Sequence, residues 1–318
     1  MKHLLDTTEQ ELLDWLNSHG HAPYRVGQIR RWVFEKRADS FADMSDLPKK
    51  LREDLAGDFS LFNASVAKQY QADDGTEKLL VELADGGRIE CVLLRDGHRR
   101  SICISTQVGC AMGCVFCATG QMGFARNLTV AEIFEQALQY ARLLTAEGDR
   151  LSNVVLMGMG EPFHNYDASL AAIHLLMQRL GIGARHITVS TVGLVPQIRR
   201  FADEGLQVKL AISLHAATDE ERAALLPVNK RYPLQDLIAA CRDYADKTGR
   251  RVTFEWAAIS GENDTPEQAR ALGQLLHGLK CHVNIIPLNP TGGYAGGPSS
   301  MRRVNAFIEA LAQYGISA

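Results

Sequence analysis

From residue 101 to the end of the chain, extended apolar segments alternate with segments of helical periodicity. Six segments rich in Val, Ile and Leu predict strands, at 101–106, 153–158, 186–191, 208–214, 252–259 and 282–288. Helical segments follow them, at 129–144, 167–180, 195–204, 219–225 with 234–247, 265–279 and 300–314. Strands of this composition are typical of parallel sheets covered on both faces. Six β-then-α units predict an α/β fold, either a doubly wound sheet or a barrel with fewer than eight strands.

The first hundred residues follow two other patterns. Residues 1–58 predict three short helices: the first begins with the capping box of Thr8 and Glu11, the second contains Val26, Ile29 and Val33, and the third runs from about Pro48 to Gly57. Extended segments at 78–83 and 88–94 flank an Asp-Gly-Gly turn, which predicts a hairpin. We therefore expect a helical N-terminal accessory domain at 1–60, whose basic residues suit RNA binding, a β-hairpin extension at 61–95 and an α/β core at 96–318.

The composition excludes several classes of protein. Of the 318 residues, 46% are hydrophobic and 22% charged, as in a folded globular protein, and the net charge of −3 excludes a uniformly basic nucleic-acid coat. The N-terminal segment has no apolar signal core, and no 18 apolar residues run together. The sequence thus predicts a cytoplasmic protein with no membrane partner.

Three of the seven cysteines stand together after the first predicted strand of the α/β core. Cys110, Cys114 and Cys117 have a spacing that can surround one soft metal centre. An iron–sulfur cluster with one open iron and a zinc site completed by His164 or His215 both fit this spacing, and the spacing favours the cluster. In an α/β fold the active site lies at the carboxyl ends of the strands, where this loop begins.

This cysteine motif, placed after the first strand of a six-unit α/β core, resembles that of the radical S-adenosylmethionine (radical SAM) enzymes. The flanking segments are similar to those of the RlmN-type adenosine methyltransferases: STQVGCAMGCVFCATGQMGFARNLT, MGMGEP, STVGLVP, LAISLHA, PVNKRYP, IIPLNP and the N-terminal YRVGQIRRWVFEKRADSFADMSDLPKKLR. The resemblance covers nearly the whole chain. It implies a partial (β/α)6 radical SAM barrel with a small helical N-terminal domain and a β-hairpin extension.

The resemblance also assigns roles to residues. It implies a [4Fe–4S] cluster on Cys110, Cys114 and Cys117, and S-adenosylmethionine (SAM) bound by residues at strand ends: Gly160, Glu161, Ser190, Ser213, Leu214, His215 and Asn289. It makes Glu90 the proton acceptor and Cys103 the redox partner of a second reactive cysteine. Without the resemblance, the residues alone would indicate that Glu161 is a charge that caps the N-terminus of a helix, and that Glu90 is a solvated residue of the hairpin.

The implied reaction is methylation of adenosine carbon 2 in 23S rRNA and in tRNA. Two alternatives stay open: methylation of adenine carbon 8, as in Cfr-type enzymes, and a metal-stabilised RNA-binding module without catalysis. The implied partners are the two RNAs and an electron donor such as flavodoxin or ferredoxin, with the protein acting as a monomer. Residues 22–52 have eight Lys or Arg against four Asp or Glu, and further cations fall on core connections, at Arg126, Arg185, Arg199, Arg200, Lys230 and Arg231.

The sequence departs from the family at its C-terminal end. The segment with the family's methyl-carrying cysteine should begin where this sequence stops, at Ala318, and no cysteine follows Cys281. We therefore expect this chain to bind the cluster and SAM but to be impaired in methyl transfer.

Overall fold

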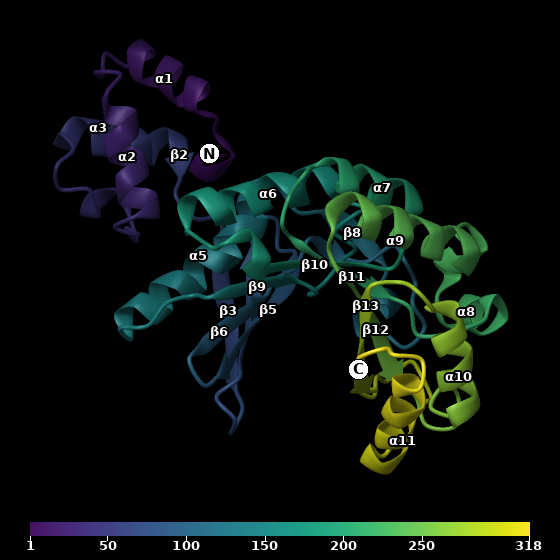
Figure 1. Cartoon of the computed structure of the whole chain (residues 1–318). Coiled ribbons are helices and arrows are strands. Elements are labelled where there is room, and N and C mark those ends of the chain that lie inside the picture. Colours follow the sequence, from purple (N-terminus) through teal and green to yellow (C-terminus); the bar gives the residue numbers. More distant parts are fainter. The chain divides into compact units, whose positions relative to one another are not determined.

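The computed structural model describes all 318 residues, which divide into two compact units (Figure 1). The first unit comprises Met1–Ser105, Asn127–Val154 and Asp167–Gly183, and the second comprises Thr106–Arg126, Val155–Tyr166 and Ala184–Ala318. The chain passes between the units several times. No helix of the structure is both long and apolar enough to cross a membrane.

The first unit begins with three helices, α1 (Glu9–Ser18), α2 (Arg25–Phe34) and α3 (Lys49–Asp58), which share a hydrophobic core. The capping box of Thr8 and Glu11 begins α1, as the sequence predicts. Short 3-10 turns lie at Leu4–Asp6 and Phe41–Asp43. The two-residue strands β1 (Lys2–His3) and β2 (Phe59–Ser60) pair in parallel. The sequence analysis missed this pair because two residues are too few to show a period.

The rest of the first unit is an antiparallel sheet with helices. Its strands are β3 (Ala64–Gln71), β4 (Glu77–Leu83), β5 (Arg88–Asp96) and β6 (Arg99–Cys103), with consecutive strands paired. Helix α5 (Val130–Ala146) packs on this sheet, where the Tyr140 hydroxyl donates to the carbonyls of Glu77 and Cys91. The predicted hairpin is therefore confirmed and extended by one strand on each side.

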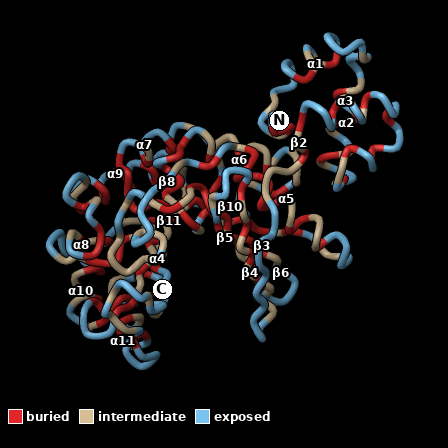
Figure 2. Tube along the Cα trace, turned by 180° about the vertical axis from the view of Figure 1, so that it is seen from behind, coloured by how far each residue is buried: buried red, intermediate tan, exposed pale blue.

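The second unit contains four parallel strands, β10 (Ile187–Thr191), β11 (Lys209–Ser213), β12 (Val252–Ala258) and β13 (Cys281–Pro287), paired in chain order. Their helices are α7 (Val195–Asp203), α8 (Asp219–Leu225), α9 (Leu234–Thr248), α10 (Pro266–Leu275) and α11 (Met301–Ala312). Single 3-10 turns occur at Ala184–His186 and Pro227–Lys230. In Figure 2 buried residues mark β10 and β11. On β12 buried and half-buried residues alternate, and on β13 only Val283 is buried, so the expected cover on both faces does not extend along the last two strands.

Strand β9 (Asn153–Leu156) and helix α6 (Tyr166–Arg179) have residues in both units, as does the short strand β8 (Phe124–Asn127). With β9 and α6, the six predicted β-then-α repeats are confirmed in order. The first strand is displaced, since β6 spans Arg99–Cys103 rather than 101–106. The chain leaves the strand early because the Ser105 N–H donates to the Gln136 side chain, and the Thr106 N–H donates to the Met159 carbonyl.

Candidate active site

The three-cysteine motif lies on a loop held by its own backbone. The loop follows β7 (Gln107–Gly109), which pairs with β8 (Phe124–Asn127), a small ribbon that the sequence analysis did not predict. The Cys110 N–H donates to the Gly123 carbonyl at 2.7 Å. Gly109 has φ +74°, and a Cβ there would lie 2.0 Å from the Gly123 oxygen. Only glycine therefore allows the two strands to approach this closely.

The far end of the loop is fixed as well. The helical turn α4 (Ala118–Gln121) begins directly after Cys117, whose N–H donates to the Cys114 carbonyl at 3.2 Å. The Val115 N–H donates to the Leu225 carbonyl at the end of α8, at 3.1 Å. The three thiols are thus presented by a loop that is held at both ends and in its middle.

These cysteines line one cavity together with the carboxyl ends of the strands in the second unit. The cavity has a volume of about 220 Å³. It brings together most of the predicted site residues, namely Cys110, Cys114, Cys117, Gly160, Glu161, Ser190, Ser213 and His215. Two predicted residues do not line it: Leu214 is fully buried beside it, and Asn289 is exposed beyond the end of β13.

Glu161 is buried, with only 4% of its surface exposed. One oxygen accepts from the Phe163 N–H at 2.9 Å and the other from the Val192 N–H at 2.8 Å. Burial raises the pKa of this carboxyl to about 7, although its hydrogen bonds oppose the shift. The preceding Gly160 has φ +99°, and a Cβ there would meet Gln107 at 2.6 Å. Because Gly160 has no side chain, its backbone atoms form the cavity wall at this position.

His215 is buried in the left-handed region of the backbone, at φ +61°. Its Nδ1 accepts from the Ala257 N–H at 2.9 Å, and its ring meets Phe116 of the cysteine loop edge-on, with the centroids 4.9 Å apart. Burial, followed by the Arg222 charge, lowers the pKa of the imidazole to about 3. The ring is therefore neutral and carries its proton on Nε2, where it can act as a donor.

Two further polar residues belong to this region, and the sequence analysis missed both. Arg222 on α8 is completely buried. Its guanidinium donates to the carbonyl of Val192, which follows β10, and to that of Leu214, which follows β11. Glu255 on β12 lines the cavity, half-buried, and burial raises its pKa. Arg222 could have been found only from the position of its helix. Glu255 had a local signal, a carboxylate within an otherwise apolar predicted strand.

The cavity's thiols suit a cluster better than a single ion. Burial raises the pKa of Cys110 to about 11 and that of Cys114 to about 12, so these thiols become ligands when a cationic centre displaces their protons. No group of three or more His, Cys, Asp or Glu side chains is arranged around a single ion. In an iron–sulfur cube each thiolate binds a different iron, so the three sulfur atoms can lie farther apart than they can around a single ion.

The two histidines weighed as a fourth zinc ligand are otherwise engaged. Nδ1 of His164 lies 2.9 Å from the Gln107 side-chain amide, and Nδ1 of His215 is occupied by the Ala257 N–H. The residues present therefore fit a three-thiolate cluster with one open iron.

The predicted residues Glu90 and Cys103 lie in the first unit. The Glu90 carboxylate on β5 is 3.0 Å from the Lys78 ammonium on the neighbouring strand. Cys103, half-buried, ends β6 opposite Val92. Nearby Cys91 is buried, and this raises its pKa to about 12, so it is an unreactive thiol.

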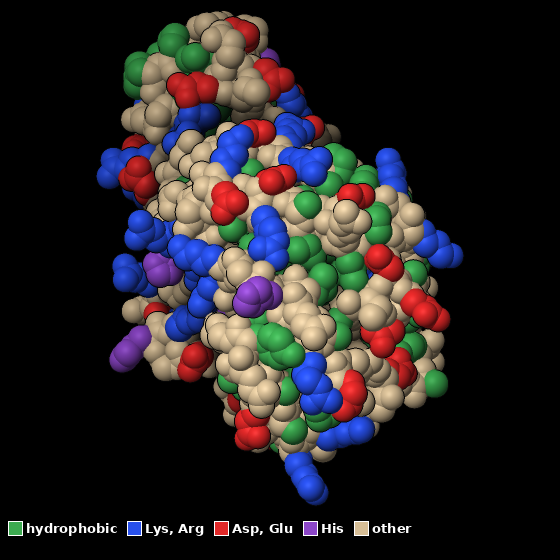
Figure 3. Space-filling model, turned by 45° about the vertical axis from the view of Figure 1, so that its right-hand side comes forward, with side chains coloured by type: hydrophobic (Ala, Val, Ile, Leu, Met, Phe, Trp, Pro, Cys, Tyr) green, Lys and Arg blue, Asp and Glu red, His purple; other side chains and the backbone are tan.

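The basic residues between 22 and 52 are largely engaged within the first unit. Arg30 pairs with Glu9, and three more ion pairs join Arg31 to Glu35, Lys36 to Asp46 and Lys49 to Glu53. Tyr24 is 64% exposed and lies 4.8 Å from the Arg25 guanidinium. On the face of the molecule drawn in Figure 3, Lys and Arg are interspersed with Asp and Glu and are most frequent along the left-hand side.

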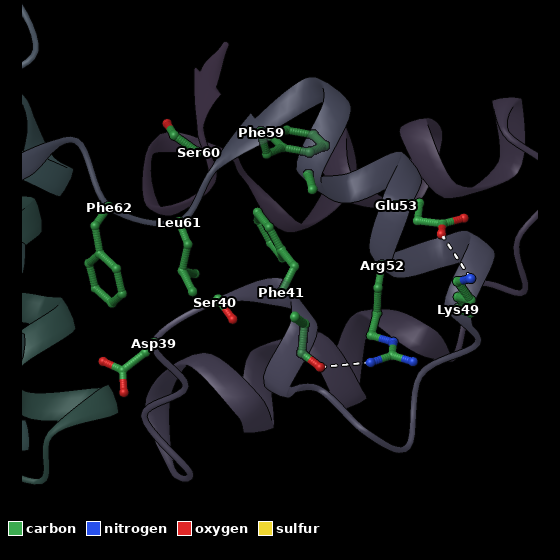
Figure 4. A pocket seen from close by; sticks show the side chains of 12 residues that line it. Asp39, Ser40, Phe41, Lys49, Arg52, Glu53, Phe59, Ser60, Leu61 and Phe62 are labelled. Carbon is green, nitrogen blue, oxygen red and sulfur yellow. Dashed lines mark hydrogen bonds and ion pairs between the residues drawn. The ribbon is translucent and has the colours of Figure 1, made fainter.

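A larger cavity, of about 630 Å³, lies among the N-terminal helices (Figure 4). Phe41, Phe59 and Phe62 line much of it, and its cations are already engaged, since Arg52 donates to the Ala42 carbonyl and Lys49 pairs with Glu53. This cavity offers no group suited to catalysis.

Comparison with known proteins agrees with the fold and the cysteine loop. Residues 104–272 match the model of the radical SAM superfamily. The chain is therefore a radical SAM protein, a class that uses a [4Fe–4S] cluster and SAM. Residues 2–61 match the model described as the ribosomal RNA large subunit methyltransferase N-terminal domain.

Full-length relatives narrow the family. The chain is 50% identical to dual-specificity RNA methyltransferase RlmN 1 of Myxococcus xanthus, over 98% of this chain and 88% of the relative. It is 48% identical to a probable RlmN of Geobacillus kaustophilus, over 98% and 86%. A crystal structure of a radical SAM methyltransferase from Sphaerobacter thermophilus matches with a TM-score of 0.96 and 48% identity, covering 100% of this chain and 94% of that one. The chain belongs to the RlmN family, and the predicted fold class is confirmed.

Proposed function

We propose that this protein methylates carbon 2 of an adenosine in 23S rRNA and in tRNA by radical SAM chemistry. The observation that carries the proposal is the cavity where the three-cysteine loop meets Glu161, Ser190 and His215. It occurs in a chain 50% identical to a relative named as a dual-specificity RNA methyltransferase.

Each part of the cavity has a proposed role. Cys110, Cys114 and Cys117 hold the [4Fe–4S] cluster, which when bound supplies the electron that cleaves SAM. The backbone around Gly160 and Glu161 receives the amino group of SAM. Polar groups at the ends of β10 and β11 (Ser190, Ser213 and His215), the backbone of Leu214 and the side chain of Asn289 bind the remainder of SAM.

The first unit supplies the proposed proton acceptor and thiol. Glu90, whose carboxylate lies 3.0 Å from the Lys78 ammonium, is the proposed acceptor of the proton from the ring carbon being methylated. The Cys103 thiol is the proposed redox partner of a second reactive cysteine. Exposed Tyr24, backed by Arg25, is suited to stacking on an unpaired base of the RNA.

The proposed reaction requires a reducing electron donor, such as flavodoxin or ferredoxin. Because its substrates are ribosomal and transfer RNA, we expect it to take place in the cytoplasm, with the protein acting as a monomer.

The test is anaerobic reconstitution followed by incubation with SAM, a reductant and each RNA. We expect 5′-deoxyadenosine as a product, and the methylated nucleoside to be sought in the digested RNA by mass spectrometry is 2-methyladenosine. Cys114→Ala should lose iron and SAM cleavage together, whereas the control Cys281→Ala should keep both. Methylation at carbon 8 would instead identify the Cfr-type reaction. RNA binding without iron or SAM cleavage would identify a non-catalytic module.

A further inference from the structure

Glu255 lies in the middle of a polar row that crosses three strands of the second unit. In the parallel register, Ser213 on β11 stands opposite Glu255 on β12, and Glu255 stands opposite Asn284 on β13. On β12, Phe254 and Trp256 are buried, while Glu255 between them points to the other face and lines the cysteine cavity. The row therefore gives the cavity wall a hydroxyl and a carboxylate, and the exposed amide of Asn284 lies beside the carboxylate.

The Glu255 carboxylate has one committed oxygen and one open oxygen. Nδ2 of Asn284 donates to Oε2 at 2.8 Å, and this is the hydrogen bond that the structure gives the side chain. Glu161, the other carboxylate in the cavity, differs because both of its oxygens accept backbone N–H groups. Glu255 is thus the cavity carboxylate that is free to accept from a ligand.

We propose that Glu255 binds the ribose hydroxyls of SAM, and that Asn284 is a positioning residue that orients its carboxylate. This inference rests on the proposed function, because it takes SAM as the ligand of the cavity. A half-buried carboxylate accepts strongly from a vicinal diol, the use that dinucleotide-binding folds make of an acidic residue.

The position of Glu255 favours the sugar over the ammonium group of SAM. In the proposed function, the backbone of Gly160 and Glu161, which follow β9, would receive the amino group of SAM. In the strand order β9, β10, β11, β12, Glu255 is three strands away from that segment, roughly 14 Å across the sheet at the usual strand spacing. That separation places it at the nucleoside end of the ligand.

The test divides SAM into its two halves. Calorimetry on the reconstituted protein measures the binding of 5′-deoxyadenosine and, separately, of methionine. We expect Glu255→Ala to weaken 5′-deoxyadenosine binding on the order of tenfold to a hundredfold, and to leave methionine binding unchanged. Asn284→Ala should weaken 5′-deoxyadenosine less, by roughly threefold, because the carboxylate is kept but loses its orientation. Exposed Glu309→Ala on α11 is the matched control and should change neither affinity.

Removal of hydroxyls from the ligand gives a second, independent readout. The 2′-deoxy and 3′-deoxy analogues of 5′-deoxyadenosine should bind the wild type more weakly than the parent nucleoside, but should bind Glu255→Ala as well as the parent does. Cluster absorbance and thermal melting establish that each variant is folded. An undiminished preference for the hydroxyls in Glu255→Ala would overturn the assignment, as would weakened methionine binding, which would indicate an ammonium site. Failure of the wild type to bind either half would refute the proposed function itself.

Discussion

The buried carboxylate of Glu161 and the backbone N–H of Val192 are 2.8 Å apart and join two strand ends of the second unit. Glu161 follows β9 and Val192 follows β10, while the second oxygen of Glu161 accepts from Phe163. The acidic residue of the MGMGEP segment thereby binds the protein's own backbone. What it offers a ligand is the backbone that it holds in place.

Replacement of Glu161 by Gln should therefore destabilise the fold. An amide has one accepting oxygen, so either the Phe163 or the Val192 N–H would face a donor and lose its partner. We expect Glu161→Gln to lower the free energy of unfolding by about 1–3 kcal/mol in urea titration. Exposed Glu309→Gln should change it by less than about 0.5 kcal/mol. Equal stability of the two variants would show that the clamp contributes nothing.

The close approach of Gly109, at the end of β7, to the Gly123 carbonyl predicts that a side chain at position 109 disturbs the cysteine loop. An alanine at position 109 would place its Cβ 2.0 Å from the Gly123 carbonyl and would need φ +74°, so the cysteine loop must shift. We expect Gly109→Ala to lose most of its iron and sulfide after anaerobic reconstitution. Gly297→Ala is the control, because nothing lies within 4 Å of its added Cβ and its φ is not positive. Full iron content in Gly109→Ala would contradict this reading of the loop.

The strands, helices and cysteine loop were accessible from the sequence because each has a local signal. The period of apolar residues predicted β10 to β13 within one or two residues, and three cysteines within eight positions marked the cavity. Glu161, Ser190 and His215 line one cavity, as expected of residues at the carboxyl ends of parallel strands, and their roles stay predictions.

The misses have a common physical origin in long-range pairing. The row of Ser213, Glu255 and Asn284 depends on the register between strands, which no local pattern encodes. The charge count of the N-terminal segment has the same limit, because it does not show that Arg30 and Lys36 form ion pairs with residues 21 and 10 positions away. The predicted role of this segment in RNA binding stays a prediction.

Titration of His215 predicts how stability depends on pH in the protein without its cluster. Its pKa falls from 6.5 to about 3 on folding, so between these values the unfolded chain binds more protons. Stability from this group is therefore complete above pH 6.5 and is lost as the pH falls. Relative to His215→Asn, the wild type should lose roughly 1.5 kcal/mol between pH 6.5 and 5.

Asparagine is the appropriate comparison because it tolerates φ +61° and can accept the Ala257 N–H without titrating. The charged group facing His215 is Arg222, which stays protonated over this range. Because the pKa of Glu161 is raised, its contribution to the free energy of unfolding falls as the pH rises. Glu161 is present in both proteins, so this contribution cancels in the comparison. Parallel pH profiles from denaturant titrations of the two proteins would show that His215 is not buried as a neutral ring.

Arg222 gives the largest predicted effect on stability. Its guanidinium is completely buried and donates to three backbone carbonyls and one amide oxygen, those of Val192, Ser213, Leu214 and Asn229. Burial lowers its pKa only to about 10, so the group is charged at neutral pH.

A lysine ammonium concentrates its donors at one point and cannot reach acceptors spread around a planar fork. We expect Arg222→Lys to cost about 3 kcal/mol or more in urea unfolding, since it leaves a buried charge poorly satisfied. Arg302→Lys, at an exposed position on α11, should cost less than about 0.5 kcal/mol. Because three of the four acceptors (Val192, Ser213 and Leu214) lie at the ends of β10 and β11, Arg222→Lys should also weaken SAM binding in calorimetry. An Arg222→Lys variant as stable as Arg302→Lys would mean that these strand ends need no such support.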